Sequence, residues 1–469
     1  MLEIVFNLNN NDKVPLYMQI YKHIKDEILC GNIPSDSKLP SIRNLCKDLK
    51  ISKNTVEAAY EQLIAEGYVK SKNRSGLYVE KMESGFSNFK KLSSNSYIEK
   101  TFEDSYPPIK YDFSSGQIDL SAFPYTHFRK ILTRCVDEYS NELLLYGDHK
   151  GDCGLRYEIA KHIHHSRGVI CSPEQILISS GTQQSLNLLC LILLNLHSNI
   201  AFENPSYIGA KDVFKHFNFH INPINLNEYG IDIDSLNKSD SKIVYVTPSH
   251  QYPYGMVMPI SKRLKLLHWA NENDGIIIED DYDGEFRYKG KSIPSLQGLD
   301  ETGRVVYLGS FSKSLMPSMR ISYLVLPKSL LNIYEEKYKT YEQPVPRFLQ
   351  KALEIFIKEG YWDKHLRKSK VLYKKKQDVL VNSITKYLDK NVTIIGSDSG
   401  LHLLIKINTT LKEYELIDNA LKAGVKVNPT LVNWIDPQND LLPVIFIGFA
   451  GIQIDHIPEA IKALSKCWF

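Results

Sequence analysis

The chain has 469 residues, of which 43% are hydrophobic and 24% charged, a composition that excludes a long disordered protein. At roughly 100–200 residues per domain, this length predicts two to four domains. The net charge of +3, with 11 Lys and Arg against 10 Asp and Glu in the first 80 residues, excludes a polycation. Any binding of nucleic acid must therefore come from a local surface.

A small module is predicted over residues 12–80. It begins with a helix over about 15–29, which Gly31 and Pro34 end. Ser41 and Ser52 can each cap a further short helix, and the two helices are separated by a tight turn. The apolar residues that recur at helical spacing in the three helices are Leu16, Ile20, Ile24 and Ile28; Ile42, Leu45 and Leu49; and Val56, Ala59, Tyr60 and Leu63. This pattern predicts a helix-turn-helix.

A hairpin follows the third helix. Residues 68–72 and 77–79 flank a turn formed by Asn73-Arg74-Ser75-Gly76, which predicts a wing. The third helix begins with polar residues that can bind phosphates or reach base edges in a major groove, namely Ser52, Lys53, Asn54 and Thr55. The alternative is an ordinary three-helix scaffold whose polar faces are only solvated.

Three stretches of this module resemble the GntR family of winged-helix regulators. They are Lys38-Leu39-Pro40-Ser41-Ile42-Arg43, Ser52-Lys53-Asn54-Thr55-Val56 and Glu66-Gly67-Tyr68. The resemblance implies that the module binds double-stranded operator DNA. It implies DNA contacts by Ser41, Arg43, Lys53, Asn54, Thr55, Arg74 and Gly76. Ser52, on the polar face of the third helix, is added to these candidates.

Residues 81–110 are rich in Ser, Lys, Glu and Asn and are expected to form an extended linker. From residue 111 onward, short apolar runs alternate with helical patterns. The predicted strands are 176–179, 200–202, 243–246, 275–278, 305–308 and 322–326. Such runs are typical of strands buried on both faces, which predicts an α/β fold with a mostly parallel sheet flanked by helices. A smaller α+β subdomain is expected over about 346–469, with strands at 392–395, 401–405 and 444–447.

Two reactive side chains follow neighbouring predicted strands. Asp280 lies just past the run 275–278, and Lys313 follows the run 305–308 within Gly309-Ser310-Phe311-Ser312-Lys313. Ligands of open α/β sheets collect at the carboxyl ends of the strands. Pyridoxal 5′-phosphate (PLP) requires a lysine amine for its aldehyde and a carboxylate for its pyridine nitrogen. Alternatively, Glu279-Asp280-Asp281 could bind Mg²⁺ and Gly181-Thr182 could simply cap a helix.

The region 111–469 resembles the fold-type I aminotransferases, and its fusion to a GntR module resembles the MocR subfamily. This resemblance implies that Lys313 binds the PLP aldehyde, Asp280 the pyridine nitrogen and Tyr282 the ring hydroxyl. It further implies that Tyr207 packs against the ring and that residues 247–251 line the site. The residues implied to bind the phosphate are Ser310, Ser312, Arg320, Gly181 and Thr182. It also implies a homodimer in which Tyr146-Gly147 enters the partner's site.

The chain departs from the aminotransferases at one position that matters for the effector. Aminotransferases hold the substrate carboxylate with an arginine of the C-terminal subdomain, and this chain has no arginine after Arg367. We therefore expect PLP itself to be the signal, as in the regulators of vitamin B6 synthesis called PdxR, and no efficient catalysis. Three alternatives remain: another cation anchors an amino-acid effector, the protein is a working aminotransferase with a DNA-binding head, or the large domain is a dimeriser without cofactor.

The remaining sequence features bear on the cellular compartment. The number of cysteines is odd, at seven, and no pair has the C-x-x-C spacing of zinc or redox sites, which favours reduced thiols. The most apolar stretch, 186–196, contains two asparagines and is too short for a membrane span. The first residues lack the pattern of a signal peptide. We expect a cytoplasmic protein with no membrane role and no metal site.

Overall fold

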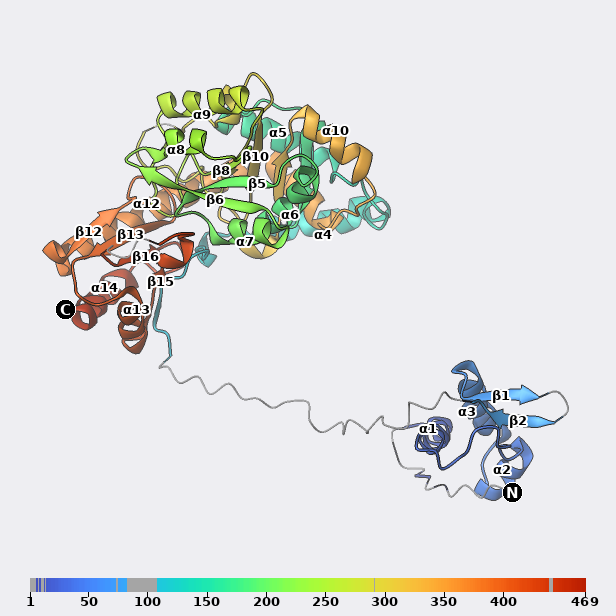
Figure 1. Cartoon of the computed structure of the whole chain (residues 1–469). Coiled ribbons are helices and arrows are strands. Elements are labelled where there is room, and N and C mark those ends of the chain that lie inside the picture. Colours follow the sequence, from blue (N-terminus) through green and yellow to red (C-terminus); the bar gives the residue numbers. More distant parts are fainter. Residues whose placement is uncertain are drawn as a thin grey trace. The chain divides into compact units, whose positions relative to one another are not determined.

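The computed structural model describes residues 6, 8–9, 12, 14–72, 75–81, 108–290, 292–437 and 442–469. The chain divides into two compact units between residues 103 and 104 (Figure 1). Each unit is described by itself. Among the described residues, no helix combines the length and the apolar character that crossing a membrane requires.

The N-terminal unit is a winged helix-turn-helix, as predicted. Its elements are α1 (Leu16–Leu29), α2 (Ile42–Leu49), α3 (Lys53–Ala65), β1 (Val69–Lys72) and β2 (Gly76–Val79). Ser41 Oγ accepts a hydrogen bond from Asn44 N at 3.2 Å, and Ser52 Oγ accepts one from Thr55 N at 3.3 Å. These serines therefore cap α2 and α3. The apolar faces of the three helices form one buried core.

The C-terminal unit is built on an eight-stranded sheet (Figure 1). Its strands, in spatial order, are β4 (Ile176–Ser179), β11 (Ser322–Val325), β10 (Val305–Ser310), β9 (Ile276–Asp281), β8 (Ile243–Val246), β5 (Asn199–Asn204), β6 (His220–Asn227) and β7 (Gly230–Ile231). The five strands from β10 to β6 run parallel, whereas β11 is antiparallel to both neighbours and β7 is antiparallel to β6. The expected mostly parallel sheet is confirmed.

Helices cover both faces of this sheet, because alternate residues of each strand face opposite sides. Leu177, Tyr245 and Leu308 pack on one side with the helices α6 (Thr182–Leu193), α7 (Ile208–His216) and α10 (Lys328–Lys337). The adjacent strand residues, such as Ile178, Val244 and Tyr307, face the other side of the sheet, where the buried residues form two separate hydrophobic clusters. The helices of that side are α4 (Tyr125–Leu143), α5 (Cys153–Arg167), α8 (Ile233–Lys238), α9 (Ile260–Glu272) and α11 (Arg347–Lys358).

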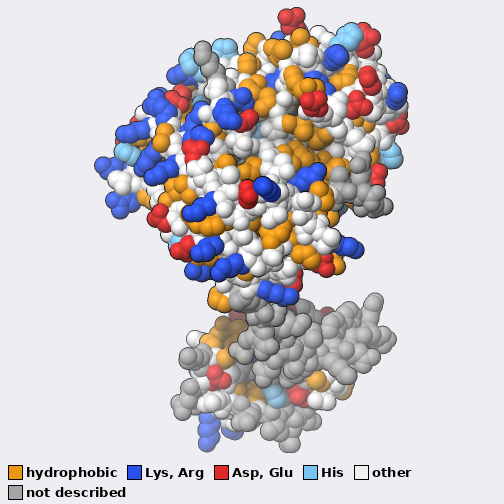
Figure 2. Space-filling view, turned by 90° about the vertical axis from the view of Figure 1, so that its left-hand side faces the viewer, with side chains coloured by type: hydrophobic (Ala, Val, Ile, Leu, Met, Phe, Trp, Pro, Cys, Tyr) orange, Lys and Arg blue, Asp and Glu red, His pale blue; other side chains and the backbone are white. Residues whose placement is uncertain are grey.

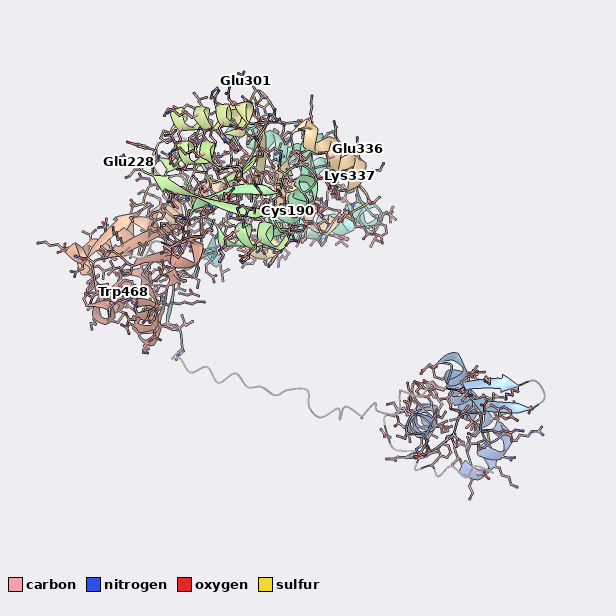
Figure 3. The ribbon with its side chains drawn as sticks, viewed as in Figure 1. Cys190, Glu228, Glu301, Glu336, Lys337 and Trp468 are labelled. Atoms are coloured by element: carbon pink, nitrogen blue, oxygen red, sulfur yellow. The ribbon has the colours of Figure 1, made fainter. Side chains whose placement is uncertain are left out.

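The smaller subdomain has a separate core around a four-stranded antiparallel sheet. Its elements are α12 (Tyr361–Tyr387), β12 (Val392–Ile395), β13 (His402–Ile407), α13 (Glu413–Lys422), β14 (Val425–Lys426), β15 (Asn428–Pro429), β16 (Val444–Gly448) and α14 (His456–Trp468). Trp468, near the end of the chain, is buried in this subdomain (Figure 3). Helix α11 packs with α4 and α5 in the core of the large sheet, so it does not belong to the core of the smaller subdomain. The chain passes from one core to the other within α12, whereas the smaller subdomain was expected to begin at about residue 346.

Candidate functional site

A cavity of about 340 Å³ opens at the carboxyl ends of β8, β9 and β10. Eight of the nine side chains predicted to bind a cofactor line it: Thr182, Tyr207, Asp280, Tyr282, Ser310, Ser312, Lys313 and Arg320. The ninth, Gly181, lies against the guanidinium of Arg320. The structure thus brings together residues that are up to 139 positions apart in the sequence, from Gly181 to Arg320.

Asp280 is buried at the end of β9, with 4% of its surface exposed. The hydroxyl of Tyr245, on the neighbouring strand β8, donates a hydrogen bond to Asp280 Oδ2 at 2.5 Å. Burial raises the pKa of Asp280 to about 7, although the hydrogen bond from Tyr245 acts in the opposite direction. A carboxylate in this environment is stabilised by a cationic partner, and a protonated pyridine nitrogen would be one.

The acidic neighbours of Asp280 point away from the cavity. Asp281 forms a buried ion pair with Arg167, with a distance of 2.6 Å between Oδ2 and Nε. Glu279 accepts hydrogen bonds from the backbone N–H groups of Leu296 and Gln297. Successive strand residues face opposite sides of a sheet, so the three carboxylates do not converge. In the described part of the chain, no group of three acidic, cysteine or histidine side chains could hold a metal ion, which argues against the magnesium alternative.

Lys313 follows β10 and reaches the same cavity as Asp280. Strands β9 and β10 are parallel neighbours, with Asp280 opposite Leu308, which places both reactive groups at the same edge of the sheet. Burial lowers the pKa of Lys313, an effect that the negative charge of Asp283 partly offsets. A lowered pKa keeps more of the amine neutral, and the neutral amine is the nucleophile that an aldehyde requires.

The other end of the cavity has the features of a phosphate site. Ser310 Oγ and Ser312 Oγ lie 3.0 Å apart, and helix α6 begins directly after Gly181. A Cβ atom on Gly181 would lie 2.0 Å from Nη2 of Arg320, and the φ angle of this glycine is +89°. Hydroxyls, helix N–H groups and a guanidinium close to one another are a typical phosphate-binding arrangement.

Tyr282 is held by a histidine that the sequence analysis had placed in the lining segment. Nδ1 of His250 lies 2.8 Å from the Tyr282 hydroxyl and 2.9 Å from Oδ2 of Asp283. Because a carboxylate only accepts hydrogen bonds, Nδ1 carries the hydrogen. The hydroxyl hydrogen of Tyr282 is then left for another acceptor, such as a ring oxygen of a ligand.

The expected lining segment 247–251 is only partly in place. Thr247 lines the cavity, whereas Ser249 contacts Arg167 and His250 lies behind Tyr282. Residues that the sequence analysis did not select also line the cavity: Ser115, Gly116, Gln183, Tyr245 and Tyr252. Tyr245 lies inside an apolar run, so its sequence context predicted a core residue. Nothing in the local sequence pattern indicated that Ser115 and Gly116 belong to the site. Tyr146 is 91% exposed on this chain, and its predicted role in a partner's site remains a prediction.

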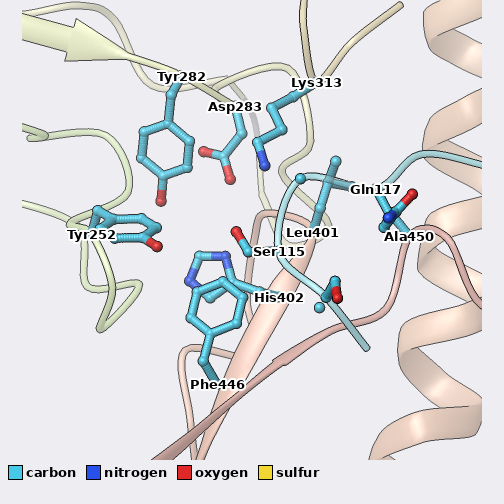
Figure 4. A pocket seen from close by; sticks show the side chains of 13 residues that line it. Ser115, Gln117, Tyr252, Tyr282, Asp283, Lys313, Leu401, His402, Phe446 and Ala450 are labelled. Carbon is cyan, nitrogen blue, oxygen red and sulfur yellow. The ribbon is translucent and has the colours of Figure 1, made fainter. Parts of the chain in front are cut away.

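A second, much smaller pocket of about 20 Å³ also borders Lys313 and shares Tyr252 and Tyr282 with the large cavity (Figure 4). Its walls include Asp283, Leu401, His402, Phe446 and Ala450, and among the described residues that line it Lys313 is the one cation of Lys or Arg type. Burial lowers the pKa of His402 to about 3, so this imidazole is neutral. The pocket therefore offers no guanidinium or ammonium group, other than Lys313, to a carboxylate.

The predicted DNA-contacting residues lie on the surface of the N-terminal unit. Ser41, Arg43, Ser52, Lys53, Asn54 and Gly76 are exposed and Thr55 is half-buried, whereas Arg74 lies outside the described residues. Lys53 also forms an ion pair with Glu57 at 2.9 Å. On the C-terminal unit, Lys and Arg are spread among acidic and apolar side chains on the face shown in Figure 2.

Comparison with known proteins matches both units. Residues 16–79 match the family of bacterial regulatory proteins called gntR, and residues 108–435 match aminotransferase class I and II. Over its whole length the chain is 40% identical to the HTH-type transcriptional regulator YdeL of Bacillus subtilis, which it also covers completely. It is 33% identical to the probable rhizopine catabolism regulatory protein MocR of Rhizobium meliloti, over 98% of this chain and 95% of that protein.

The chain belongs to the MocR-type regulators of the GntR family. This MocR-type chain is 27% identical to the pyridoxine biosynthesis regulator PdxR of Corynebacterium glutamicum, over 86% of each protein. Its C-terminal unit also has the fold of the multiple substrate aminotransferase of Thermococcus profundus, with a TM-score of 0.70 and 26% identity over 76% of this chain and 90% of that one. MocR-type regulators thus combine a DNA-binding head with the fold of a PLP-dependent enzyme family.

Proposed function

We propose that this regulator binds PLP covalently through Lys313 and that PLP is the signal that changes its affinity for DNA. The observation that carries the proposal is the pairing of Asp280 and Lys313 at neighbouring strand ends in one cavity, where Asp280 accepts a hydrogen bond from Tyr245 and forms no ion pair with a Lys, Arg or His among the described residues. PLP supplies an aldehyde for the lysine, a basic ring nitrogen for the carboxylate and a phosphate for the far end.

The residues of the cavity fit this group. The carboxylate of Asp280 would hold the proton on the ring nitrogen, and Tyr282 would donate to the ring oxygen. Tyr207 would pack against the ring. The phosphate would be bound by Ser310, Ser312, Arg320, Thr182 and the N–H groups that follow Gly181. The glycine is required at position 181 because any side chain there would displace Arg320.

The small pocket that borders Lys313 supports PLP rather than an amino acid as the effector. A volume of about 20 Å³ holds little more than one water molecule. Lys376, a buried lysine of the C-terminal subdomain, forms an ion pair with Asp119 at 2.6 Å and donates to the carbonyl of Ala450 in the pocket wall. This lysine is therefore not free to anchor a carboxylate. The similarity to PdxR also favours genes of vitamin B6 synthesis as targets.

We infer that the N-terminal unit reads operator DNA. The exposed start of α3 would enter the major groove and the hairpin β1–β2 would contact the adjacent backbone. A homodimer would carry two such heads, which predicts an operator of two half-sites. The role of the aminotransferase fold is then to sense the cofactor, not to turn over a substrate.

The experiment that tests this proposal is a titration of the PLP-free protein, first with PLP and then with a panel of amino acids. Visible absorbance reports on the cofactor, and a gel shift on the DNA upstream of its own and neighbouring genes reports on DNA affinity. We expect PLP alone to change DNA affinity. An additional spectral change with one amino acid, coupled to DNA release, would show an amino-acid sensor, and accumulation of a keto acid would show an aminotransferase.

A further inference from the structure

The segment that joins the linker to the cavity is fixed to the smaller subdomain at its first end. Strand β3 (Tyr111–Asp112) pairs in parallel with β14, with Tyr111 opposite Val425. The N–H groups of Lys110 and Tyr111 donate to the carbonyl of Gly424 at 2.9 and 3.0 Å, and Phe113 N donates to Lys426 O at 2.9 Å. Residues 110–113 are therefore expected to move with this subdomain.

The other end of the segment is held on the same subdomain. Asp119 forms the ion pair with Lys376 of α12, and its backbone N–H donates to the hydroxyl of Tyr373 at 3.1 Å. Both Lys376 and Tyr373 are buried. An ion pair from which water is largely excluded is weakened little by solvent, so this attachment is firm.

Between these anchors, residues 113–117 pass directly over the reactive lysine; we call them the strap. Ser115 and Gly116 line both the large cavity and the small pocket. Ser115 is labelled in the view of the small pocket (Figure 4). A Cβ atom on Gly116 would lie 3.5 Å from Nζ of Lys313, and the φ angle of Gly116 is +89°. Tyr252 lines both spaces together with Ser115. A ligand bound at Lys313 must therefore share its space with the strap.

The strap packs against β16 and the residues that follow it too closely to slide independently. A Cβ atom on Gly448 would lie 2.7 Å from the carbonyl oxygen of Ser114, and one on Gly451 would lie 2.5 Å from Cβ of Gln117. The carbonyl of Phe113, which is fully buried, accepts hydrogen bonds from Gly448 N and Asn428 Nδ2. Close packing transmits a displacement instead of absorbing it.

We propose that the strap couples the cavity at Lys313 to the linker: occupancy of the cavity repositions Ser115 and Gly116, and the smaller subdomain and the linker attached to β3 follow. This inference rests on the proposed function, because it names how the PLP signal leaves its site. PLP can shift the protein only by its difference in affinity for the two positions of the strap. A change in strap packing should therefore alter the coupling more than it alters PLP binding.

The variant Gly451→Ala tests the strap without touching a residue that lines the cavity. Its new methyl group would collide with Cβ of Gln117, and the added substitution Gln117→Gly would remove that collision. Ser329→Ala, at an exposed position of α10, is the matched control. For each full-length protein, PLP affinity is measured by absorbance and DNA affinity by gel shift, with and without PLP.

We expect Gly451→Ala to bind PLP about as tightly as the wild type, while the PLP-dependent fold-change in DNA affinity falls toward one. The double variant should recover much of that change, and Ser329→Ala should retain all of it. If PLP changes the DNA affinity of Gly451→Ala as much as that of the wild type, the coupling through the strap is wrong, but the proposed function is not affected. If PLP does not change the DNA affinity of the wild type, both the coupling through the strap and the proposed function are wrong.

Amide hydrogen exchange on the wild type provides a second measurement if Gly451→Ala does not fold. PLP should change the exchange of peptides that contain residues 110–117 and of their partner β14. Exchange that changes only around Lys313 and Arg320, and not in 110–117, would contradict the coupling.

Discussion

The hydroxyl of Tyr245 donates a hydrogen bond to the carboxylate of Asp280, with a distance of 2.5 Å between the two oxygens. Both side chains are buried, Tyr245 fully. The bond favours the ionised form of Asp280, which is the form that can pair with a protonated pyridine nitrogen. Tyr245, which lines the cavity beside Asp280, therefore prepares the carboxylate for its partner.

Replacing Tyr245 by Phe should weaken PLP binding. A hydrogen bond to a charged group contributes about 1.5–3 kcal/mol. Since the bond is already present without PLP, the loss of affinity should be at most roughly 10- to 150-fold. A PLP titration followed by absorbance measures it. The matched control is Tyr307→Phe, because Tyr307 donates to Asp281, which faces the other side of the sheet. Equal losses of PLP affinity in the two variants would show that Asp280 has no special role.

PLP binding should also weaken as the pH falls below about 7, because the raised pKa of Asp280 means that its carboxyl takes up a proton there. Folding raises this pKa above its unfolded value of 3.8, so the folded, PLP-free protein binds more protons between these values and loses stability as the pH rises through them. PLP affinity is measured against pH for the wild type and for Asp280→Asn. Titration of Lys313 affects both proteins, so the difference between the two profiles reports on the Asp280 carboxyl. Parallel profiles would contradict the assignment.

Gly181→Ala should reduce the affinity for PLP by displacing the guanidinium of Arg320, which lies where the new methyl group would be. The positive φ angle adds backbone strain of order 1 kcal/mol or more. Pyridoxal without its phosphate is the discriminating ligand. We expect its weaker binding to change little in this variant, and an equal loss for both ligands would place the phosphate elsewhere.

Lys53→Ala should weaken binding to operator DNA, most strongly at low salt. If Lys53 neutralises one phosphate, the slope of log affinity against log salt should fall by about one. Fluorescence anisotropy at several salt concentrations gives the slope. Lys22→Ala, on the exposed side of α1, is the control that should leave the slope unchanged. An unaltered slope for Lys53→Ala would remove α3 from the DNA interface.

Much of the fold was predictable because the strong patterns are local. The capping serines Ser41 and Ser52 marked the starts of α2 and α3, and the continuous apolar runs marked β8, β9 and β10. Strand β6 was missed because it is half exposed, and its sequence alternates polar and apolar residues around a proline. The antiparallel direction of β11 is a tertiary property that no local pattern encodes.

In the candidate site, too, residues with a local sequence signal could be predicted and residues placed by tertiary contacts could not. Asp280 and Lys313 could be found because each follows a buried strand, and the structure brings them together as expected. Tyr245 could not be found, because a tyrosine inside an apolar run looks like core until its hydroxyl partner is known. The strap was missed for a different reason: Ser115 and Gly116 are held near Lys313 by long-range contacts. One of these is the pairing between β3 and β14, which are 313 positions apart from Asp112 to Val425.

The most direct test of a covalent PLP signal compares the wild type with Lys313→Ala in the same gel shift on operator DNA, with and without PLP. Borohydride treatment and mass analysis should locate a pyridoxyl adduct on Lys313 in the wild type only. We expect PLP to change the DNA affinity of the wild type and to leave that of Lys313→Ala unaltered. An equal PLP response in both proteins, or no response in the wild type, would contradict the account.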